Sequence, residues 1–270
     1  MVWAYETLAA MPEWIVHECT SDFDYEILQT IFGAVYMIMT FVFSPTDMGI
    51  PASRPRRYTI MVLKAMSKPL LSFDKQGFGS IAFARCVLTG HVFFSAGVHI
   101  VGKYVEELAA SLHFPARKPD GSVWSMREVL SAARRASARR FERYCEKRKL
   151  PKKYIVNLTQ SLKRFSHTEI VPTLLCKTSL LWDMLLERLL VPLEYLSVMC
   201  IPVFDDTKPQ EDMFPVERLA RSGVLESSDI TYLAGNGMSL AAIGAVLLHL
   251  FSTVQMHTPC TPAASSEDRT

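Results

Sequence analysis

Three short polar segments of this 270-residue chain carry side chains that could bind or activate a small polar group. The first contains Glu18, which directly follows the apolar run 14–17, a position where open α/β sheets place ligand-binding residues. Its carboxyl group could hold an amino group or a ring nitrogen. A glutamate at the end of a strand is also often a capping or surface residue, so both interpretations stay open on this residue alone.

Arg54 and Arg56 form the second candidate. They follow a turn at residues 49–51 and lead into the strand-like segment 57–63. Because alternate residues of a strand face the same side, we expect both guanidinium groups to point at one carbonyl or phosphate. The structural alternative is a solvated edge strand.

The third candidate is the turn formed by Gly235, Asn236 and Gly237, which precedes the apolar run 238–254. A glycine-rich turn before a helix leaves backbone N–H groups available to a ligand. The same pattern is also an ordinary helix start. By itself it does not identify a binding site.

A basic cluster occupies the middle of a chain whose formal net charge is only +2. Residues 127–153 carry eleven Lys and Arg against three Glu, a local charge of +8, and a helix is expected over 126–149. We expect salt-dependent phosphate contacts from its arginines. The alternative is a solvated face paired with Glu142 and Glu146. The arginines concerned are Arg134, Arg135, Arg139, Arg140 and Arg143.

Composition restricts the class of protein. Apolar residues make up 49% and charged residues 21%, which excludes a disordered or fibrous chain. Mean hydropathy is +0.15, but the apolar runs 27–43 and 238–254 contain polar residues and are at the lower length limit for a membrane span, so we expect buried core and no membrane. Six scattered cysteines without a C-x-x-C pair indicate reduced thiols and no metal site, and no signal peptide is evident.

The segments that must position these residues alternate in type. Segment 14–17 has strand character, 25–32 has helical spacing ending at Gly33, and 35–43 and 57–63 are strand-like. This order is typical of an α/β sheet flanked by helices. We also expect one helix from Ser228 to 254 and a disordered tail at 257–270.

In this order the segments resemble the C-terminal two-thirds of the DNA cytosine-5 methyltransferase family. HECT at 17–20 is similar to its E-N-V segment, GIPASRPRRYTI at 49–60 to G-x-P-Q-x-R-x-R-x-Y, and LAGNGMSLAAIG at 233–244 to its closing G-N segment. Segment 171–203 is similar to P-T-L…R-x-L-T-P-x-E-x-x-R-L-Q-G-F-P. On its fixed positions fall Pro172, Thr173, Arg188, Pro192 and Glu194.

The resemblance implies an α/β fold with part of a Rossmann-like, S-adenosylmethionine-dependent methyltransferase sheet and an inserted target-recognition region. It implies four parts: catalytic sheet at 1–64, target recognition at 65–227, a closing helix at 228–256 that packs back on the catalytic domain, and the tail 257–270.

The resemblance also assigns roles. Glu18 would grip a flipped cytosine, Arg56 would hold its O2, and Arg54 would bind backbone or orient Glu18. The turn at 235–237 would form the floor of the S-adenosylmethionine site, and Arg188 would join the residues that bind double-stranded DNA.

Departures from the family pattern limit the expected activity. The glycine-rich cofactor loop and the Pro-Cys-Gln nucleophile are absent, Cys19-Thr20 replaces Asn-Val, Ala52 replaces Gln, and residues 197–201 replace Arg-Leu-Gln-Gly-Phe. We therefore expect the chain to be inactive alone and to need a separate N-terminal half. The alternatives are a non-catalytic DNA-binding remnant and an unrelated protein. The basic segment 147–153 resembles a nuclear import signal.

Overall fold

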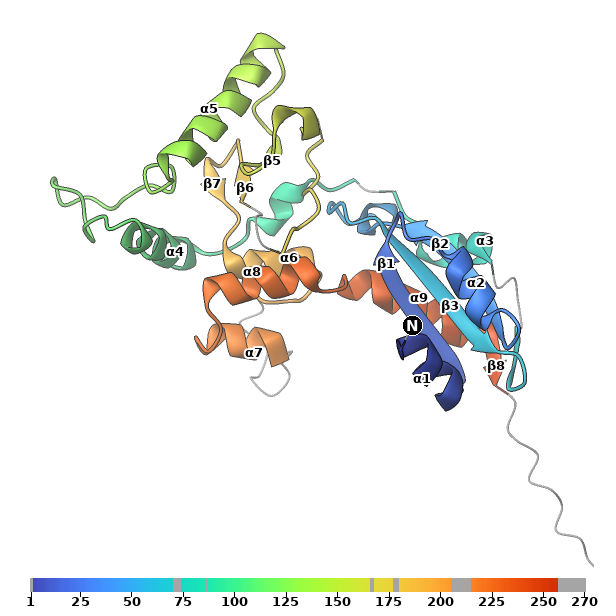
Figure 1. Cartoon of the computed structure of the whole chain (residues 1–270). Helices are drawn as coiled ribbons and strands as arrows, with labels where there is room; N and C mark the ends of the chain where they lie inside the picture. Colours follow the sequence, from blue (N-terminus) through green and yellow to red (C-terminus); the bar gives the residue numbers. More distant parts are fainter. Residues whose placement is uncertain are drawn as a thin grey trace, which may run out of the picture. The chain divides into compact units, whose positions relative to one another are not determined.

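The computed structural model divides into two compact units, and each is described by itself. Unit 1 comprises residues 1–43, 55–83 and 244–270, and unit 2 comprises residues 44–54 and 84–243 (Figure 1). Helices and short sheets occur together, so the predicted α/β class is confirmed. The described residues are 2–69, 74–85, 87–165, 168–176, 180–204 and 215–256. The tail 257–270 lies outside them.

A three-stranded antiparallel sheet forms the centre of unit 1. Its strands are β1 (Trp14–Thr20), β2 (Tyr36–Phe43) and β3 (Arg56–Leu63), in the order β1-β3-β2. The predicted strands at 35–43 and 57–63 are thereby confirmed. The expectation that Glu18 follows a strand was wrong: the ladder with β3 continues to Thr20, so Glu18 lies inside β1, opposite Tyr58.

The two faces of this sheet are covered differently. Helices α1 (Val2–Ala10) and α2 (Glu26–Phe32) contribute to a buried aliphatic and aromatic cluster with β2 and β3. On the other face, Phe41 and Phe43 of β2 contact Phe78 of α3 (Lys75–Ala82), and Tyr58 of β3 packs against the same two rings. A short ladder joins β4 (Ser67–Pro69) to β8 (Val254–Met256). Both faces of β3 are therefore buried.

Unit 2 contains a smaller antiparallel sheet and most of the helices. Strands β5 (Ile155–Asn157), β6 (Leu181–Asp183) and β7 (Arg188–Leu189) pair in the order β5-β6-β7. Single 3-10 turns occur at Pro45–Asp47, Gly90–Phe93 and Leu162–Arg164. The helices are α4 (Val98–Ser111), α5 (Ala132–Lys147), α6 (Pro192–Val198), α7 (Pro215–Arg221) and α8 (Ser227–Asn236).

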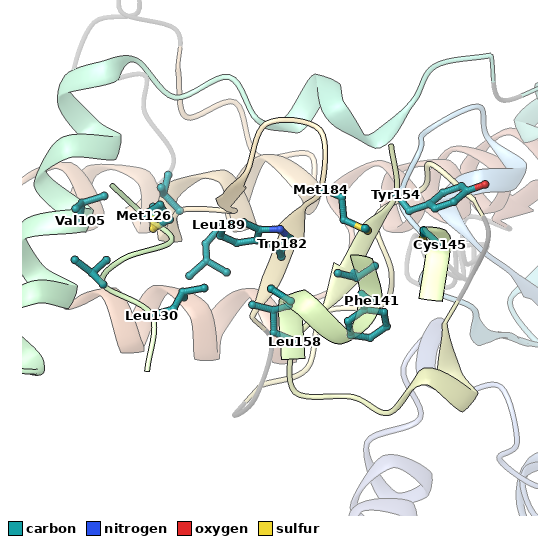
Figure 2. Packing of buried hydrophobic residues seen from close by; sticks show 14 of the residues in the cluster. Val105, Met126, Leu130, Phe141, Cys145, Tyr154, Leu158, Trp182, Met184 and Leu189 are labelled. Atoms are coloured by element: carbon teal, nitrogen blue, oxygen red, sulfur yellow. The ribbon is translucent and has the colours of Figure 1, made fainter. Parts of the chain in front are cut away.

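One buried hydrophobic cluster of unit 2 packs around Trp182, as Figure 2 shows. Phe141 and Cys145 of α5 reach this core from one side of their helix. The expected helix start at 126 was wrong. Helix α5 begins at Ala132 because the Ser131 hydroxyl caps it, accepting a hydrogen bond from the Arg134 N–H.

The helix expected from 228 to 254 is instead two helices. Helix α8 ends at Asn236, residues 237–239 leave the helical conformation, and α9 (Leu240–Thr253) follows. Together Ser227–Thr253 have the length and hydropathy of one membrane-crossing helix, by length and composition only. The separate helices have 10 and 14 residues, against about 20 for a span, which favours the interpretation as core helices.

The boundaries of the two compact units differ from the domain boundaries expected from the sequence. Segment 44–54 belongs to unit 2, and segment 65–83 belongs to unit 1. Residues 244–256 belong to unit 1 together with 1–43, and 228–243 belong to unit 2.

Candidate functional site

Glu18 and Arg56 form an ion pair on the sheet of unit 1. The distance from Arg56 Nε to Glu18 Oε1 is 3.1 Å, and the side chains of Arg56 and Glu18 are 17% and 14% exposed, respectively. Glu18 faces Tyr58 across the ladder and Arg56 faces Thr20, so both side chains lie on one face of the sheet. The pair therefore offers a carboxylate and a guanidinium side by side, partly shielded from water.

Arg54 has different partners, although only Pro55 separates it from Arg56. Its backbone N–H donates to Ser44 Oγ (2.9 Å), and its Nη2 donates to the carbonyl oxygens of Gly235 (3.1 Å) and Gly237 (2.5 Å), all within unit 2. The expectation that strand alternation points both guanidinium groups at one ligand was wrong, whereas the alternative that Arg54 binds backbone agrees with these bonds. Strand β3 begins only at Arg56, so the alternation of a strand does not extend back to Arg54.

The glycine turn ends a helix. Gly235 and Asn236 are the last residues of α8, and the Gly237 N–H already donates to the Leu233 carbonyl (2.7 Å). The expectation of N–H groups available in a turn before a helix is therefore wrong for Gly237. Asn236 is exposed and can present its carboxamide to a ligand.

A second connection joins two segments that are about 120 residues apart. Ser53 N–H donates to the Val171 carbonyl (2.8 Å), Val171 N–H donates to the Pro51 carbonyl (2.9 Å), and the Thr173 hydroxyl donates to the Ser53 carbonyl (2.9 Å). Segments 51–54, 171–173 and 235–237 thus meet within unit 2. All three segments were named from the sequence, but the hydrogen bonds between them were not predicted.

Arg188 has a structural role that the DNA-binding prediction missed. Its Nη1 and Nη2 donate to the two carboxylate oxygens of Glu194 at 2.8 and 2.7 Å, and Glu194 is fully buried. The guanidinium also lies over the Phe94 ring. The prediction that Arg188 serves DNA is corrected: its cation is used to neutralise a buried carboxylate.

The arginines of α5 separate into two groups. Arg134 and Arg135 are half-buried and donate to backbone carbonyls, Arg135 Nη1 to those of Glu128 and Leu130 at 2.7 Å. Both are therefore committed to holding backbone around α5. By contrast, Arg139, Arg140 and Arg143 are exposed.

The two glutamates of α5 pair with residues other than these exposed arginines. Glu142 pairs with Arg127 (2.8 Å) and Glu146 with Lys152 (2.7 Å). The alternative in which these glutamates neutralise the helix arginines is therefore not what the structure shows. A basic face made of Arg139, Arg140 and Arg143 remains open to solvent.

A cavity of about 1070 Å³ in unit 2 had no sequence signal of its own. Tyr104 of α4, Tyr195 of α6 and Ile230 of α8 contribute to its lining. Burial, together with nearby Glu107, raises the pKa of Tyr104 to about 12, and burial also raises the pKa of Tyr195. Both phenols therefore stay protonated at neutral pH.

Among the described residues no group of three or more His, Cys, Asp or Glu is placed to hold a metal ion.

Cys200 occupies the position of the glycine in the Arg-Leu-Gln-Gly-Phe pattern. Its φ is +64°, a left-handed conformation that favours glycine. The Ile201 N–H donates to the Leu196 carbonyl (3.0 Å), which closes α6 in the manner of a Schellman motif. The glycine of the family pattern thus falls at a position where the backbone of this chain has the left-handed conformation that favours glycine.

We expect Cys200→Gly to be more stable than Cys200→Ala by about 1 kcal/mol. Both variants lose the thiol, but only alanine keeps a Cβ in the left-handed conformation. Thermal and urea unfolding of the two proteins measures the difference. Equal stabilities would show that this backbone carries no strain.

No protein-family model matches this chain, and no curated protein matches it. Solved structures do. S. pombe Dnmt2 methyltransferase is 13% identical, with 89% of this chain and 67% of that chain covered and a TM-score of 0.48. Entamoeba histolytica methyltransferase EhMeth is 14% identical, with 89% and 63% covered and a TM-score of 0.44.

The neighbours of this structure are Dnmt2 and related methyltransferases. A mutant of Spodoptera frugiperda DNMT2 is also similar, at 13% identity and a TM-score of 0.39, with 88% of this chain and 66% of that chain covered. The chain thus spans about two thirds of the length of these proteins. At these identities and TM-scores the likeness carries no argument about function, which rests on the contacts above.

Proposed function

We propose that this chain is a DNA cytosine-5 methyltransferase-like protein that supplies one half of the active site. One observation carries the proposal. Three segments that resemble one family in the sequence are 49–60, 171–203 and 233–244, and in unit 2 residues 51–54 of the first are hydrogen-bonded both to 171–173 of the second and to 235–237 of the third. Chance matches scattered over 270 residues have no reason to meet.

The Glu18–Arg56 pair has the chemistry to read the edge of a cytosine. A carboxyl group can bond to N3 and to the N4 amino group, and a guanidinium can donate to O2. Reading this edge requires the base to leave the stack, at a cost of a few kcal/mol. In the structure the two side chains form an ion pair, with 3.1 Å between Arg56 Nε and Glu18 Oε1. An extruded base would exchange this ion pair for contacts of both groups with itself.

The residues of the closing turn fit one wall of a cofactor site. Asn236 and Met238 are exposed, whereas the carbonyls of Gly235 and Gly237 are held by Arg54. Asn236 would therefore be the side chain of this turn that contacts S-adenosylmethionine. When bound, this cofactor supplies the methyl group for carbon 5.

The nucleophile has to come from elsewhere. Family members attack carbon 6 of cytosine with a cysteine thiolate, and this chain has no Pro-Cys-Gln segment. Cys19 is adjacent to Glu18, but successive residues of a strand face opposite sides. Burial, together with the Glu18 charge, also raises the pKa of the Cys19 thiol. Cys19 is therefore a poor substitute, and a separate N-terminal half is the proposed partner.

The decisive experiment is complementation. We expect the purified chain, mixed with an N-terminal half that carries the glycine-rich loop and Pro-Cys-Gln, to transfer methyl groups to DNA. Glu18→Gln should lower this rate by about 10²–10⁴-fold, the usual contribution of a positioned acid. Glu26→Gln, an exposed residue of α2, is the matched control. Transfer that is indifferent to Glu18→Gln would contradict the role of this residue.

Double-stranded DNA is the proposed nucleic-acid partner, bound through the basic face of α5. Replacing Arg139, Arg140 and Arg143 by glutamine should reduce the dependence of log affinity on log salt by about 0.9 for each phosphate that is no longer neutralised. Affinity at low salt should fall at least tenfold. Arg85→Gln, an exposed arginine outside α5, is the control. An unchanged salt slope would remove DNA as the ligand of this face.

The second candidate function is a non-catalytic DNA-binding protein. The exposed cations of α5 favour it. DNA binding without methyl transfer in the presence of competent N-terminal halves would support this alternative. Either function fits the proposed nuclear or DNA-associated location, to which the basic segment 147–153 points.

A further inference from the structure

Arg54 is a buried cation, and its guanidinium donates to two backbone carbonyls of the 235–237 turn. The residue is 6% exposed, and a buried charge is stable only when polar partners replace water. One nitrogen, Nη2, donates to the carbonyls of Gly235 (3.1 Å) and Gly237 (2.5 Å). The backbone N–H of Arg54, bonded to Ser44 Oγ, fixes the other end of the residue.

These two carbonyls lie where a helix needs a partner. Gly235 is in the last turn of α8 and Gly237 is its C-cap, so their carbonyls have no acceptor role inside the helix. A cation at this end also interacts favourably with the helix dipole. The residue between the two bonded positions is Asn236, which is exposed. Arg54 therefore sets the backbone on both sides of Asn236.

We infer that Arg54 is a positioning residue for the Gly235–Asn236–Gly237 turn and not a residue that contacts the base. That Arg54 fixes the backbone of this turn is inferred from its hydrogen bonds alone. That it thereby affects binding of S-adenosylmethionine rests on the proposed function. The two arginines of the R-x-R pair thereby have separate tasks: Arg56 pairs with Glu18, and Arg54 fixes the turn that carries Asn236.

Amide hydrogen exchange tests the hold directly. The Gly237 N–H is bonded to the Leu233 carbonyl and the Leu240 N–H to the Met199 carbonyl. In Arg54→Met both amides should exchange roughly tenfold faster or more, since a hydrogen bond from a charged donor is removed. Arg54→Lys, which keeps the charge, should restore part of the protection. Leu158, whose N–H donates to the Leu180 carbonyl, should be unaffected.

Arg56→Met is the matched control, because it removes a guanidinium of the same motif. It should leave exchange at Gly237 and Leu240 unchanged. Equal acceleration at these amides in Arg54→Met and Arg56→Met, or none in Arg54→Met, would overturn the inference. A uniform acceleration that includes Leu158 would also overturn it, because Arg54 would then act on overall stability and not on the turn.

The complemented enzyme separates the two arginines by function. Arg54→Met should raise KM for S-adenosylmethionine by about tenfold without weakening binding to DNA with a mispaired target cytosine. Arg56→Met should do the reverse. A complemented enzyme without activity would sink the proposed function, while the exchange result would still decide the hold of Arg54 on the turn. If Arg54→Met weakened binding to DNA with a mispaired target cytosine, Arg54 would be a residue that contacts the base, and the inference would be overturned.

Discussion

Replacing Glu194 by alanine should destabilise unit 2 by about 3–5 kcal/mol, the range found when one partner of a buried ion pair is removed. Glu194 is fully buried and accepts four hydrogen bonds. Two come from Arg188 (2.8 and 2.7 Å), one from the Val191 N–H (2.9 Å) and one from the Ala96 N–H (2.8 Å). The substitution leaves all four donors without their acceptor, including a guanidinium that is only 13% exposed. Urea unfolding followed by tryptophan fluorescence would measure the loss, since Trp182 lies in the core of this unit.

A matched control exists in the same segment. Glu187 is 61% exposed and pairs with Arg127 at 3.4 Å, so Glu187→Ala should change stability by at most about 1 kcal/mol. If Glu194→Ala fails to fold, Arg188→Met with Glu194→Leu removes both charges and should recover much of the stability. A stability loss below about 1 kcal/mol for Glu194→Ala would contradict the assignment of Arg188 to this carboxylate.

Gly235→Ala should destabilise the protein by about 3 kcal/mol, although alanine favours helices over glycine. A Cβ at this position would lie 2.4 Å from the Cys176 Cα and 2.5 Å from its backbone nitrogen. The contact is with backbone, which cannot move aside as a flexible side chain can. The α8 backbone and the segment at 175–176 would have to separate. Thermal unfolding measures the loss.

Gly102→Ala provides the comparison. Gly102 lies within α4, and a Cβ there meets no atom within 4 Å. This variant should gain up to about 1 kcal/mol from the lower entropy of the unfolded chain. The two substitutions are chemically identical, so opposite signs isolate the close approach at Gly235. A gain in stability for both variants would show that the glycine is not required by packing.

Local patterns of side chains were enough to predict several strands and helices and most of the candidate residues. Strand character at 35–43 and 57–63 and helical spacing at 25–32 reappear in β2, β3 and α2, because side-chain periodicity acts over a few neighbouring residues. The order of the motifs also singled out segments 51–54, 171–173 and 235–237, which the structure joins. Exposed cations on α5 were expected from composition alone.

The partners of the charged side chains could not be predicted from local patterns, because they depend on how distant segments pack. Arg188 and Arg134 look like DNA-binding residues in the sequence, yet their partners are Glu194 and the Leu158 carbonyl. Arg54 binds carbonyls about 180 residues further along the chain. Glu18 lies within a strand because β1 continues to pair with β3. In each case the deciding atom belongs to another segment of the chain, and hydrogen-bond geometry depends on positions that no local pattern encodes.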